Sequence, residues 1–201
     1  MYFGTSVDQD AAFANLDVAA DLGATFWDTA NNYAFWAGGV GGESETVLGQ
    51  WFASRGPQAR DRIVVATKVG ALPLPGHADL DHIAGLSETA IREQVVDSLR
   101  RLDTDRIDLL YAHIDDRSGP LEETVGAFNA LIDDGLVREI AASNLTADRL
   151  RDALSVSCPR RYVGLQQRFT YLPPDPDADT APQVVLDDDT AALAQESDVT
   201  L

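Results

Sequence analysis

The chain has 201 residues, of which 33 are acidic and 15 basic, so its formal net charge is −18. This charge disfavours binding to nucleic acid or to an anionic membrane surface, because both would repel the chain. Hydrophobic residues make up 45% of the sequence, which is typical of a folded globular chain and excludes wholesale disorder, and the single cysteine, Cys158, excludes a disulfide scaffold. We therefore expect one domain over residues 1–201.

Short apolar runs recur along the chain and are predicted to form strands of a sheet. Most are rich in β-branched residues, as parallel strands buried on both faces require. In chain order they begin near residues 25, 63, 106, 137, 162 and 199. Met1 is interpreted as part of the end of a preceding strand, so that Leu201 stands where a seventh strand begins.

Between these runs the apolar residues recur at the spacing of a helix. Ser87 and Thr146 stand where N-cap residues are expected, acidic residues from Asp187 suit a helix start, and Gly23 and Gly135 suit helix ends. The predicted helices contain the apolar stripes Phe13, Leu16 and Ala20; Val47, Leu48, Trp51 and Phe52; Ile91, Val95, Leu99 and Leu102; Val125, Phe128, Leu131 and Ile132; Leu150 and Leu154; and Ala191, Leu193 and Ala194.

This alternation of strands and helices predicts an α/β fold with a parallel sheet and helices outside it. A closed (β/α)₈ barrel and an open doubly wound sheet both fit, and periodicity does not choose between them. The absence of a Gly-x-Gly-x-x-Gly fingerprint after the first strand disfavours a dinucleotide-binding doubly wound domain.

The glycine-rich run at residues 38–42 does not have the pattern of a phosphate-binding loop. No Gly-Lys-Ser/Thr follows it, and its glycines do not open directly from a strand into a helix. We interpret it as a mobile loop over a binding site.

A metal site is not expected. The acidic residues at 175–179 imitate the start of an EF-hand, but Thr180 and Leu186 stand where that loop needs glycine and glutamate. His77 and His82 lie in one long loop, but with three histidines and one cysteine in the whole chain no zinc site is predicted.

Polar side chains follow the predicted strands at their carboxyl ends, where ligands bind in parallel α/β folds. In chain order they are Asp28, Lys68, His113, Ser143 with Asn144, and Gln166. This set brings an acid, a base and a cation to one rim, which is the composition of a site that moves protons.

Tyr33, five residues beyond Asp28, is the candidate proton donor. The ordinary pKa of tyrosine, about 10, is high for this role at neutral pH. The Lys68 ammonium would stabilise the phenolate and lower that pKa, and Asp28 would hold the lysine charged and oriented. His113 would position or polarise a carbonyl oxygen, so the set predicts carbonyl reduction, which needs a proton source facing a hydride donor.

Several segments together resemble the aldo-keto reductase family, and they occur in the same order over essentially the whole chain. They are residues 28–33 (DTANNY), 42–49 (GESETVLG), 65–68 (VATK), 98–102 (SLRRL), 105–113 (DRIDLLYAH), 142–144 (ASN) and 166–169 (QQRF).

The resemblance implies a (β/α)₈ TIM barrel and an NADPH-dependent oxidoreductase that reduces an aldehyde or ketone to an alcohol, with NADH as the alternative cofactor. It implies that Tyr33 is the general acid, Lys68 lowers its pKa, Asp28 supports Lys68 and His113 orients the substrate carbonyl. It also implies that the nicotinamide amide is held by Ser143, Asn144 and Gln166. Phe35 and Trp36, which follow Tyr33, are candidate walls of the substrate pocket.

The length of the chain predicts an incomplete barrel of about six to seven βα units, because a (β/α)₈ barrel takes about 250 residues. In the family, the residues that stack on the nicotinamide and grip the phosphates lie beyond the point where Leu201 stands. Two hypotheses follow: a carbonyl reductase acting on a small molecule, or a truncated, catalytically silent fragment with an interaction or scaffold role. The expected location is cytoplasmic, since residues 1–5 carry no secretory pattern and no apolar run approaches the roughly 18 residues that cross a bilayer.

Overall fold

The sheet is parallel, and its strands follow one another in chain order. The computed structural model describes residues 1–172, 174–175 and 177–201. In this part of the chain the sheet has the order β1-β2-β3-β4-β5 and comprises β1 (Phe26–Asp28), β2 (Val64–Val69), β3 (Ile107–Ala112), β4 (Val137–Ser143) and β5 (Leu165–Gln166). A doubly wound sheet reverses its strand order at a switch point, whereas a barrel does not. The sheet is therefore part of a barrel, and the doubly wound alternative is wrong.

The two outermost predicted strands are shorter than expected. Thr200 makes a parallel bridge to Gly164 through two backbone hydrogen bonds, so the run near residue 199 extends the sheet by one residue pair. At the other end Phe3 bridges Val7 across a tight turn instead of continuing a strand. The described chain thus forms a curled half-barrel of five strands, next to which Thr200 bridges Gly164.

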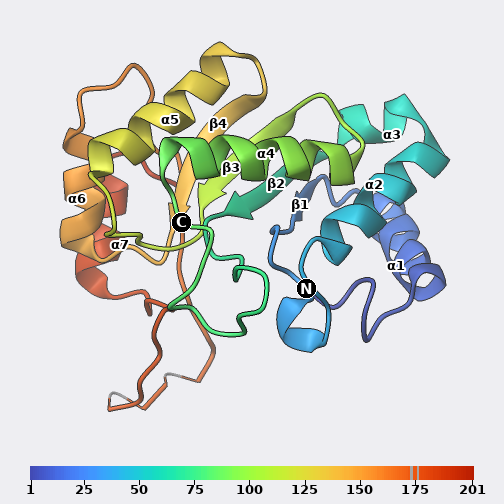
Figure 1. The fold of residues 1–201 in the computed structure, drawn as a ribbon, viewed down its shortest axis with the longest axis horizontal. Coiled ribbons are helices and arrows are strands. Elements are labelled where there is room, and N and C mark those ends of the chain that lie inside the picture. The colour runs from blue at the N-terminus through green and yellow to red at the C-terminus, as the bar shows by residue number, and fades with distance from the viewer. Residues whose placement is uncertain (173, 176) are drawn as a thin grey trace.

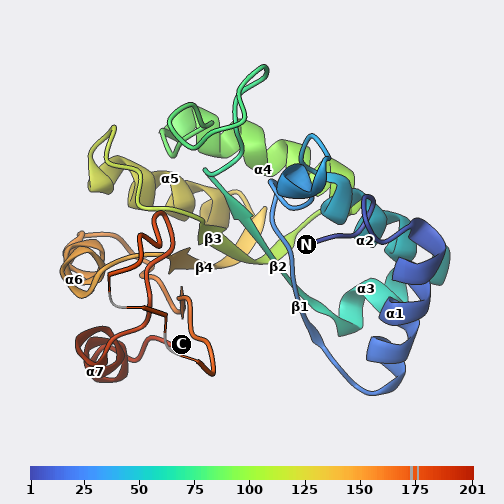
Figure 2. The ribbon, with the colours of Figure 1, turned by 90° about the horizontal axis from the view of Figure 1, so that it is seen from below.

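Helices cover the outer face of this half-barrel. Figure 2, which looks at the molecule from below, shows them as an arc outside the strands, from α1 on one side to α7 on the other. The elements are α1 (Gln9–Asp21), the 3₁₀ turn η1 (Phe35–Ala37), α2 (Glu43–Arg55), α3 (Pro57–Arg62), α4 (Glu88–Leu102), α5 (Leu121–Asp133), α6 (Ala147–Ser155) and α7 (Asp188–Glu196). Among the described residues, no helix combines the length and the apolar character that a membrane span requires.

The predicted helix starts are confirmed by their capping contacts. Ser87 Oγ accepts a hydrogen bond from the Ala90 amide at 3.3 Å, and the Thr146 and Asp187 side chains cap α6 and α7 in the same way. Pro57 follows the end of α2 at Arg55 and begins α3. Proline is tolerated there because the first turn of a helix needs no amide donor from it.

Strand alternation divides the sheet into an apolar outer face and a more polar inner face. The outer face packs against the helices around Trp27, whose ring lies 4.9 Å from that of Trp51 and 5.8 Å from that of Phe52. On the inner face Lys68 pairs in register with Tyr111, which pairs with Ala141. Figure 1 shows helices α4 and α5 in front of the strands, on the outer face of the sheet.

Helices α2 and α4 approach each other closely at Gly49. A Cβ atom there would lie 2.8 Å from the carbonyl carbon of Leu102 and would overlap the carbonyl oxygen of Arg101. This contact is with backbone, so it cannot be relieved by turning a side chain.

We expect Gly49→Ala to lower the free energy of unfolding by about 1–3 kcal/mol, because the added methyl group forces the two helices apart. Gly126→Ala in α5 is the matched control, since a Cβ there meets nothing within 4 Å among the described residues. The control should gain about 0.5–1 kcal/mol from the better helix propensity of alanine. Urea unfolding of both variants measures the difference, and equal effects would show that the close approach is not a constraint.

Candidate active site

Lys68 contacts two other predicted site residues, Asp28 and Tyr33, at the carboxyl ends of β1 and β2. Its Nζ donates hydrogen bonds to Asp28 Oδ2 at 2.6 Å and to Tyr33 OH at 2.9 Å. A third bond, of 2.7 Å, goes to the backbone oxygen of Thr29. The lysine side chain is fully buried, whereas the side chain of Asp28 is 27% exposed. An ammonium group without water needs all of these partners, so the cluster is a single polar unit.

The loop that carries Tyr33 is held by buried amide side chains. Asn31 Nδ2 donates to Gln94 Oε1 at 2.9 Å, and Asn32 Nδ2 donates to the Ala71 oxygen at 3.1 Å. Gln94 Oε1 also accepts from the Gly70 amide at 2.8 Å, so α4 joins this loop to the segment after β2.

Sequence reasoning missed Gln94 as a residue that positions the site. The available signal was its position on α4. Gln94 is three residues after Ile91 and so lies on the same helix face as Ile91 and Val95, both of which are fully buried. Gln94 itself is 8% exposed, and its Nε2 donates to the Gly85 and Ala90 oxygens.

The surroundings of Tyr33 keep its proton in place. Burial first, and then the charge and hydrogen bond of the Asp28 carboxylate, raise the pKa of Tyr33 well above its ordinary value. This direction is the opposite of the lowering expected from Lys68, because the sequence does not show how far the phenol is withdrawn from water. The pKa of Lys68 is lowered by burial, and the negative charges of Asp28 and Glu45 oppose this change.

His113, at the end of β3, lies beside Tyr33 with 6.0 Å between ring centroids. Burial and then the charge of Lys68 lower the pKa of His113 to about 3, so the imidazole is neutral at ordinary pH. Its buried Nδ1 has no hydrogen-bond partner in the part of the chain that the structure describes. A neutral imidazole can offer an N–H to a carbonyl oxygen without adding charge to the site.

Ser143, Asn144 and Gln166 complete the rim at the ends of β4 and β5. Ser143 Oγ donates to the Gln166 backbone oxygen at 2.8 Å, and Asn144 Nδ2 donates to the His113 backbone oxygen at 2.9 Å. Asn144 has a left-handed backbone, with φ of 59°. Gln166 Nε2 lies 3.5 Å from Asp28 Oδ1, which links the first and last strands of the sheet.

One cavity of about 860 Å³ opens above this rim. Tyr33, His113, Ser143, Asn144 and Gln166 line it, whereas Lys68 and Asp28 are not among the lining residues. Of the two predicted pocket walls, Trp36 lines the cavity, and Phe35 packs on Trp36 at 5.0 Å between ring centroids. Sequence analysis assigned no role to several further lining residues. Asn32, Gln167, Arg168 and Phe169 belong to the segments that carry the family resemblance, whereas Leu80 and residues 179–183 come from loops without a recognisable motif.

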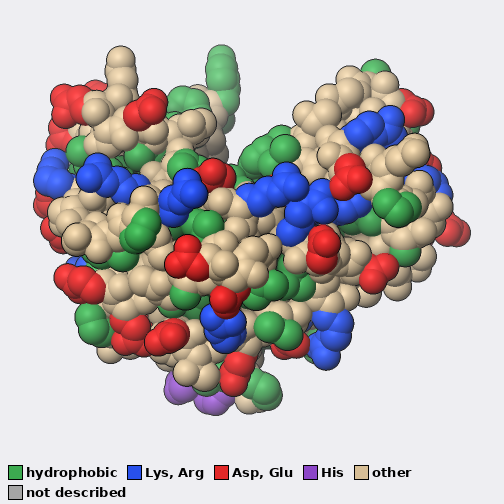
Figure 3. Space-filling model, turned by 90° about the horizontal axis from the view of Figure 1, so that it is seen from above, with side chains coloured by type: hydrophobic (Ala, Val, Ile, Leu, Met, Phe, Trp, Pro, Cys, Tyr) green, Lys and Arg blue, Asp and Glu red, His purple; other side chains and the backbone are tan. Residues whose placement is uncertain are grey.

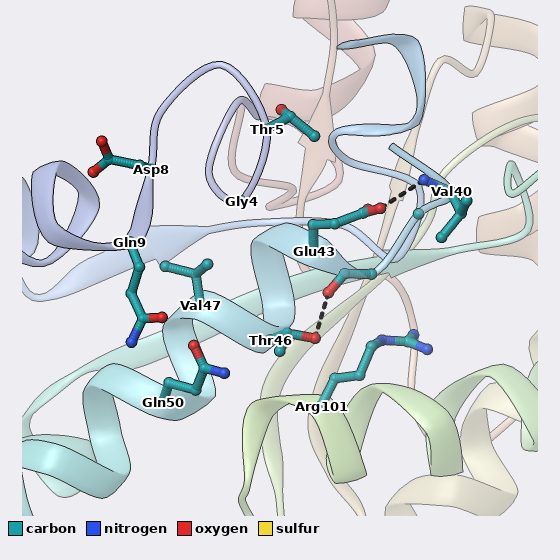
Figure 4. Close-up of a pocket in the computed structure, with 12 residues that line it drawn as sticks. Gly4, Thr5, Asp8, Gln9, Val40, Glu43, Thr46, Val47, Gln50 and Arg101 are labelled. Atoms are coloured by element: carbon teal, nitrogen blue, oxygen red, sulfur yellow. Dashed lines mark hydrogen bonds between the residues drawn. The ribbon is translucent and has the colours of Figure 1, made fainter. Parts of the chain in front are cut away.

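A second cavity, of about 600 Å³, lies outside the candidate active site (Figure 4). The N-terminal turn, the start of α2 and Arg101 line it, together with Val40, Gly41 and Gly42 of the glycine-rich run. Glu43 Oε1 accepts a hydrogen bond of 2.6 Å from the Val40 amide. The structure thus places this part of the run on the second cavity and not above Tyr33.

Comparison with known proteins relates the chain to one family. The model of the Aldo/keto reductase family matches residues 1–179. The chain is 37% identical over 175 residues to the uncharacterized oxidoreductase YrpG of Bacillus subtilis, covering 86% of this chain and 53% of that protein. It is 36% identical over 155 residues to aldo-keto reductase str7 of Strobilurus tenacellus, covering 77% and 41%. It is also 36% identical over 150 residues to aldo-keto reductase yakc [NADP(+)] of Schizosaccharomyces pombe, covering 74% and 41%. The chain spans about half the length of these relatives.

We expect Gln94→Leu to lower the free energy of unfolding by about 2–4 kcal/mol, because it leaves the Asn31 amide group and the Gly70 amide buried without an acceptor. Gln50→Leu is the matched control, since Gln50 is exposed on α2. The control should stay within about 0.5 kcal/mol of the wild type. Denaturant unfolding monitors both variants, and a wild-type midpoint for Gln94→Leu would contradict the assigned contacts.

The pKa of His113 predicts how the free energy of unfolding changes with pH. The unfolded His113 takes up a proton below its ordinary pKa of 6.5, whereas the folded one does so only near 3. The unfolded state therefore binds more protons between these values, and the folded state loses stability as the pH falls. Between about pH 6 and pH 4, the wild type should lose about 1.4 kcal/mol per pH unit more than His113→Asn. Both proteins keep every other titratable group, so parallel urea-derived stabilities across this range would refute a buried neutral His113.

Proposed function

Because the chain belongs to the aldo/keto reductase family, we propose that it is the proton-donating part of an NADPH-dependent oxidoreductase that reduces an aldehyde or ketone to an alcohol. The observation that carries the proposal is the contact of buried Lys68 with both Tyr33 and Asp28. In this arrangement the phenol can donate a proton, and the buried ammonium beside it stabilises the phenolate that remains. The NADP(+) in the name of the yeast relative supports the choice of cofactor.

Tyr33 donates its hydroxyl proton to the oxygen of the substrate carbonyl. Its raised pKa keeps the phenol protonated before the reaction. The phenolate that remains is stabilised by Lys68 Nζ at 2.9 Å, because the attraction between opposite charges is strong where water is excluded. Asp28 keeps the lysine oriented at 2.6 Å.

His113 orients the substrate by an N–H contact with the carbonyl oxygen. The imidazole is neutral, with a pKa lowered to about 3, so it does not compete with Tyr33 as a charged acid. Trp36 and Leu80 supply apolar walls to the same cavity, which favours a substrate with an apolar part beside its carbonyl group.

The residues present fit the amide end of a nicotinamide. Ser143, Asn144 and Gln166 line the cavity at the strand ends, and the buried Gln167 Oε1 is without a partner within the described ranges. Gln166 Nε2 makes only a long contact of 3.5 Å and is available as a donor. NADPH bound there would supply the hydride to the carbonyl carbon.

We expect Tyr33→Phe to reduce the turnover of an aldehyde such as 4-nitrobenzaldehyde by about 10²–10⁴-fold, because the proton donor is lost. NADPH affinity should stay within about twofold, since the phenol does not hold the cofactor. Tyr171→Phe is the matched control, because Tyr171 is 98% exposed. Oxidation of NADPH at 340 nm measures turnover, and quenching of cofactor fluorescence measures binding.

The same experiment separates the two hypotheses for the chain. Saturable NADPH binding with tyrosine-dependent turnover supports the reductase. Binding without turnover, or no saturable change at about millimolar cofactor, would support a catalytically silent fragment. Turnover retained by Tyr33→Phe would overturn the role of the tyrosine.

A further inference from the structure

The loop between β2 and α4 brings two histidines and an aspartate together outside the candidate active site. The ring centroids of His77 and His82 lie 4.0 Å apart, and His82 Nδ1 lies 2.9 Å from Asp79 Oδ1. One donor atom from each residue lies within 4.8 Å of the other two, and all three residues are exposed. Figure 3 shows the histidine side chains gathered at the lower edge of the molecule in that view. The expectation of no metal site rested on counting histidines, which does not show that two of them are neighbours.

Backbone contacts within the loop bring His77 and His82 next to each other. Pro73 and Ile83 form an antiparallel bridge, and the Leu74 amide donates to the His82 oxygen at 2.8 Å. The His77 amide donates back to the Leu74 oxygen at 3.0 Å. The loop therefore folds on itself like a hairpin, so that residues five positions apart face each other.

The charge of this segment favours a cation. Residues 69–91 contain Asp79, Asp81 and Glu88 but no lysine or arginine. No fixed positive side chain of the segment therefore opposes a metal ion, and the net charge of −18 attracts one.

We propose that His77, Asp79 and His82 bind a divalent transition metal ion of the Zn²⁺ type. The ion takes the place of the proton between His82 Nδ1 and Asp79 Oδ1, and a nitrogen of His77 is the third ligand. Imidazole nitrogens and a carboxylate suit Zn²⁺, Cu²⁺ and Ni²⁺, whereas Mg²⁺ and Ca²⁺ prefer oxygen ligands.

The geometry requires a rotation of one exposed side chain. Zinc binds such nitrogen and oxygen atoms at about 2.0–2.2 Å, so ligand atoms around one tetrahedral ion lie about 3.4 Å apart. The Asp79–His82 pair is already at 2.9 Å. His77 must turn out of its stacked position to direct a nitrogen at the ion, and an exposed side chain can do this without disturbing the core.

Metal binding would also restrain one wall of the large cavity. Leu80 lies between Asp79 and His82 in the chain and lines the cavity together with Tyr33 and His113. An ion that ties Asp79 to His82 and His77 would hold the loop tip, and with it Leu80, in one position.

Calorimetric titration of the EDTA-treated protein with ZnCl₂ tests the proposal. We expect one equivalent of Zn²⁺ to bind, and His77→Ala and His82→Ala each to weaken binding at least about tenfold, because each removes a ligand. Excess Mg²⁺ should not compete. Unchanged affinity in either histidine variant, or no saturable heat at about millimolar Zn²⁺, would overturn the site.

Paired aspartate variants separate ligation from simple charge attraction. Asp79→Asn and Asp81→Asn remove the same charge from the same turn, but only Asp79 belongs to the cluster. Asp79→Asn should weaken binding, and Asp81→Asn should leave it within about twofold of the wild type. Equal losses in the two variants would overturn the role of Asp79.

Hydrogen exchange gives a readout that does not depend on activity. Zn²⁺ should slow exchange of the amides in residues 74–82 of the wild type but not of His82→Ala. Equal exchange with and without Zn²⁺ in the wild type would contradict the restraint of the loop.

Discussion

The buried ammonium of Lys68 is the constraint on which the rest of the site depends. A charge that is removed from water is very unfavourable unless nearby groups replace its hydration. Here Asp28, the Thr29 oxygen and Tyr33 do so at 2.6, 2.7 and 2.9 Å. Asp28 ends β1, and Thr29 and Tyr33 follow it, so β1 and β2 must lie side by side and in register. The same contacts therefore stabilise both the buried charge of Lys68 and the pairing of β1 with β2.

The residue next to Lys68 connects the site to the helices outside the sheet. Thr67 points to the opposite face because side chains alternate along a strand. Its hydroxyl donates to Glu45 Oε1 at 2.6 Å, and Arg101 Nε donates to the other oxygen of that fully buried carboxylate at 2.7 Å. Glu45 lies on α2 and Arg101 on α4, so charged pairs hold both faces of β2. This arrangement gives the end of β2 little freedom, which suits a residue that must keep a tyrosine in place.

The long loop after β2 takes part in both proposals. Gln94 on α4 holds the two ends of this loop through the Gly70 amide and the Gly85 oxygen. The tip between them carries His77, Asp79 and His82, and Leu80 faces the cavity. The base of the loop is therefore fastened to the same side chain that holds Asn31 of the tyrosine loop, while the tip remains exposed. A ligand at the tip would act on the cavity through Leu80 without disturbing the contacts of Lys68 with Asp28 and Tyr33.

The sequence by itself determined the strand and helix rhythm, the caps at Ser87 and Thr146, and the polar residues that end each strand. These features are local, because burial periodicity and capping depend on residues a few positions apart. It did not determine whether the sheet belongs to a barrel or to an open doubly wound fold, since that depends on the order of the strands in the sheet. Only the tertiary structure decided that Gln94 supports the tyrosine loop and that His77 meets His82. It also showed that burial raises the pKa of Tyr33. All three properties depend on distances between residues that are remote in the sequence or on the exclusion of water. The spacing of residues along the chain encodes neither the distances nor the burial.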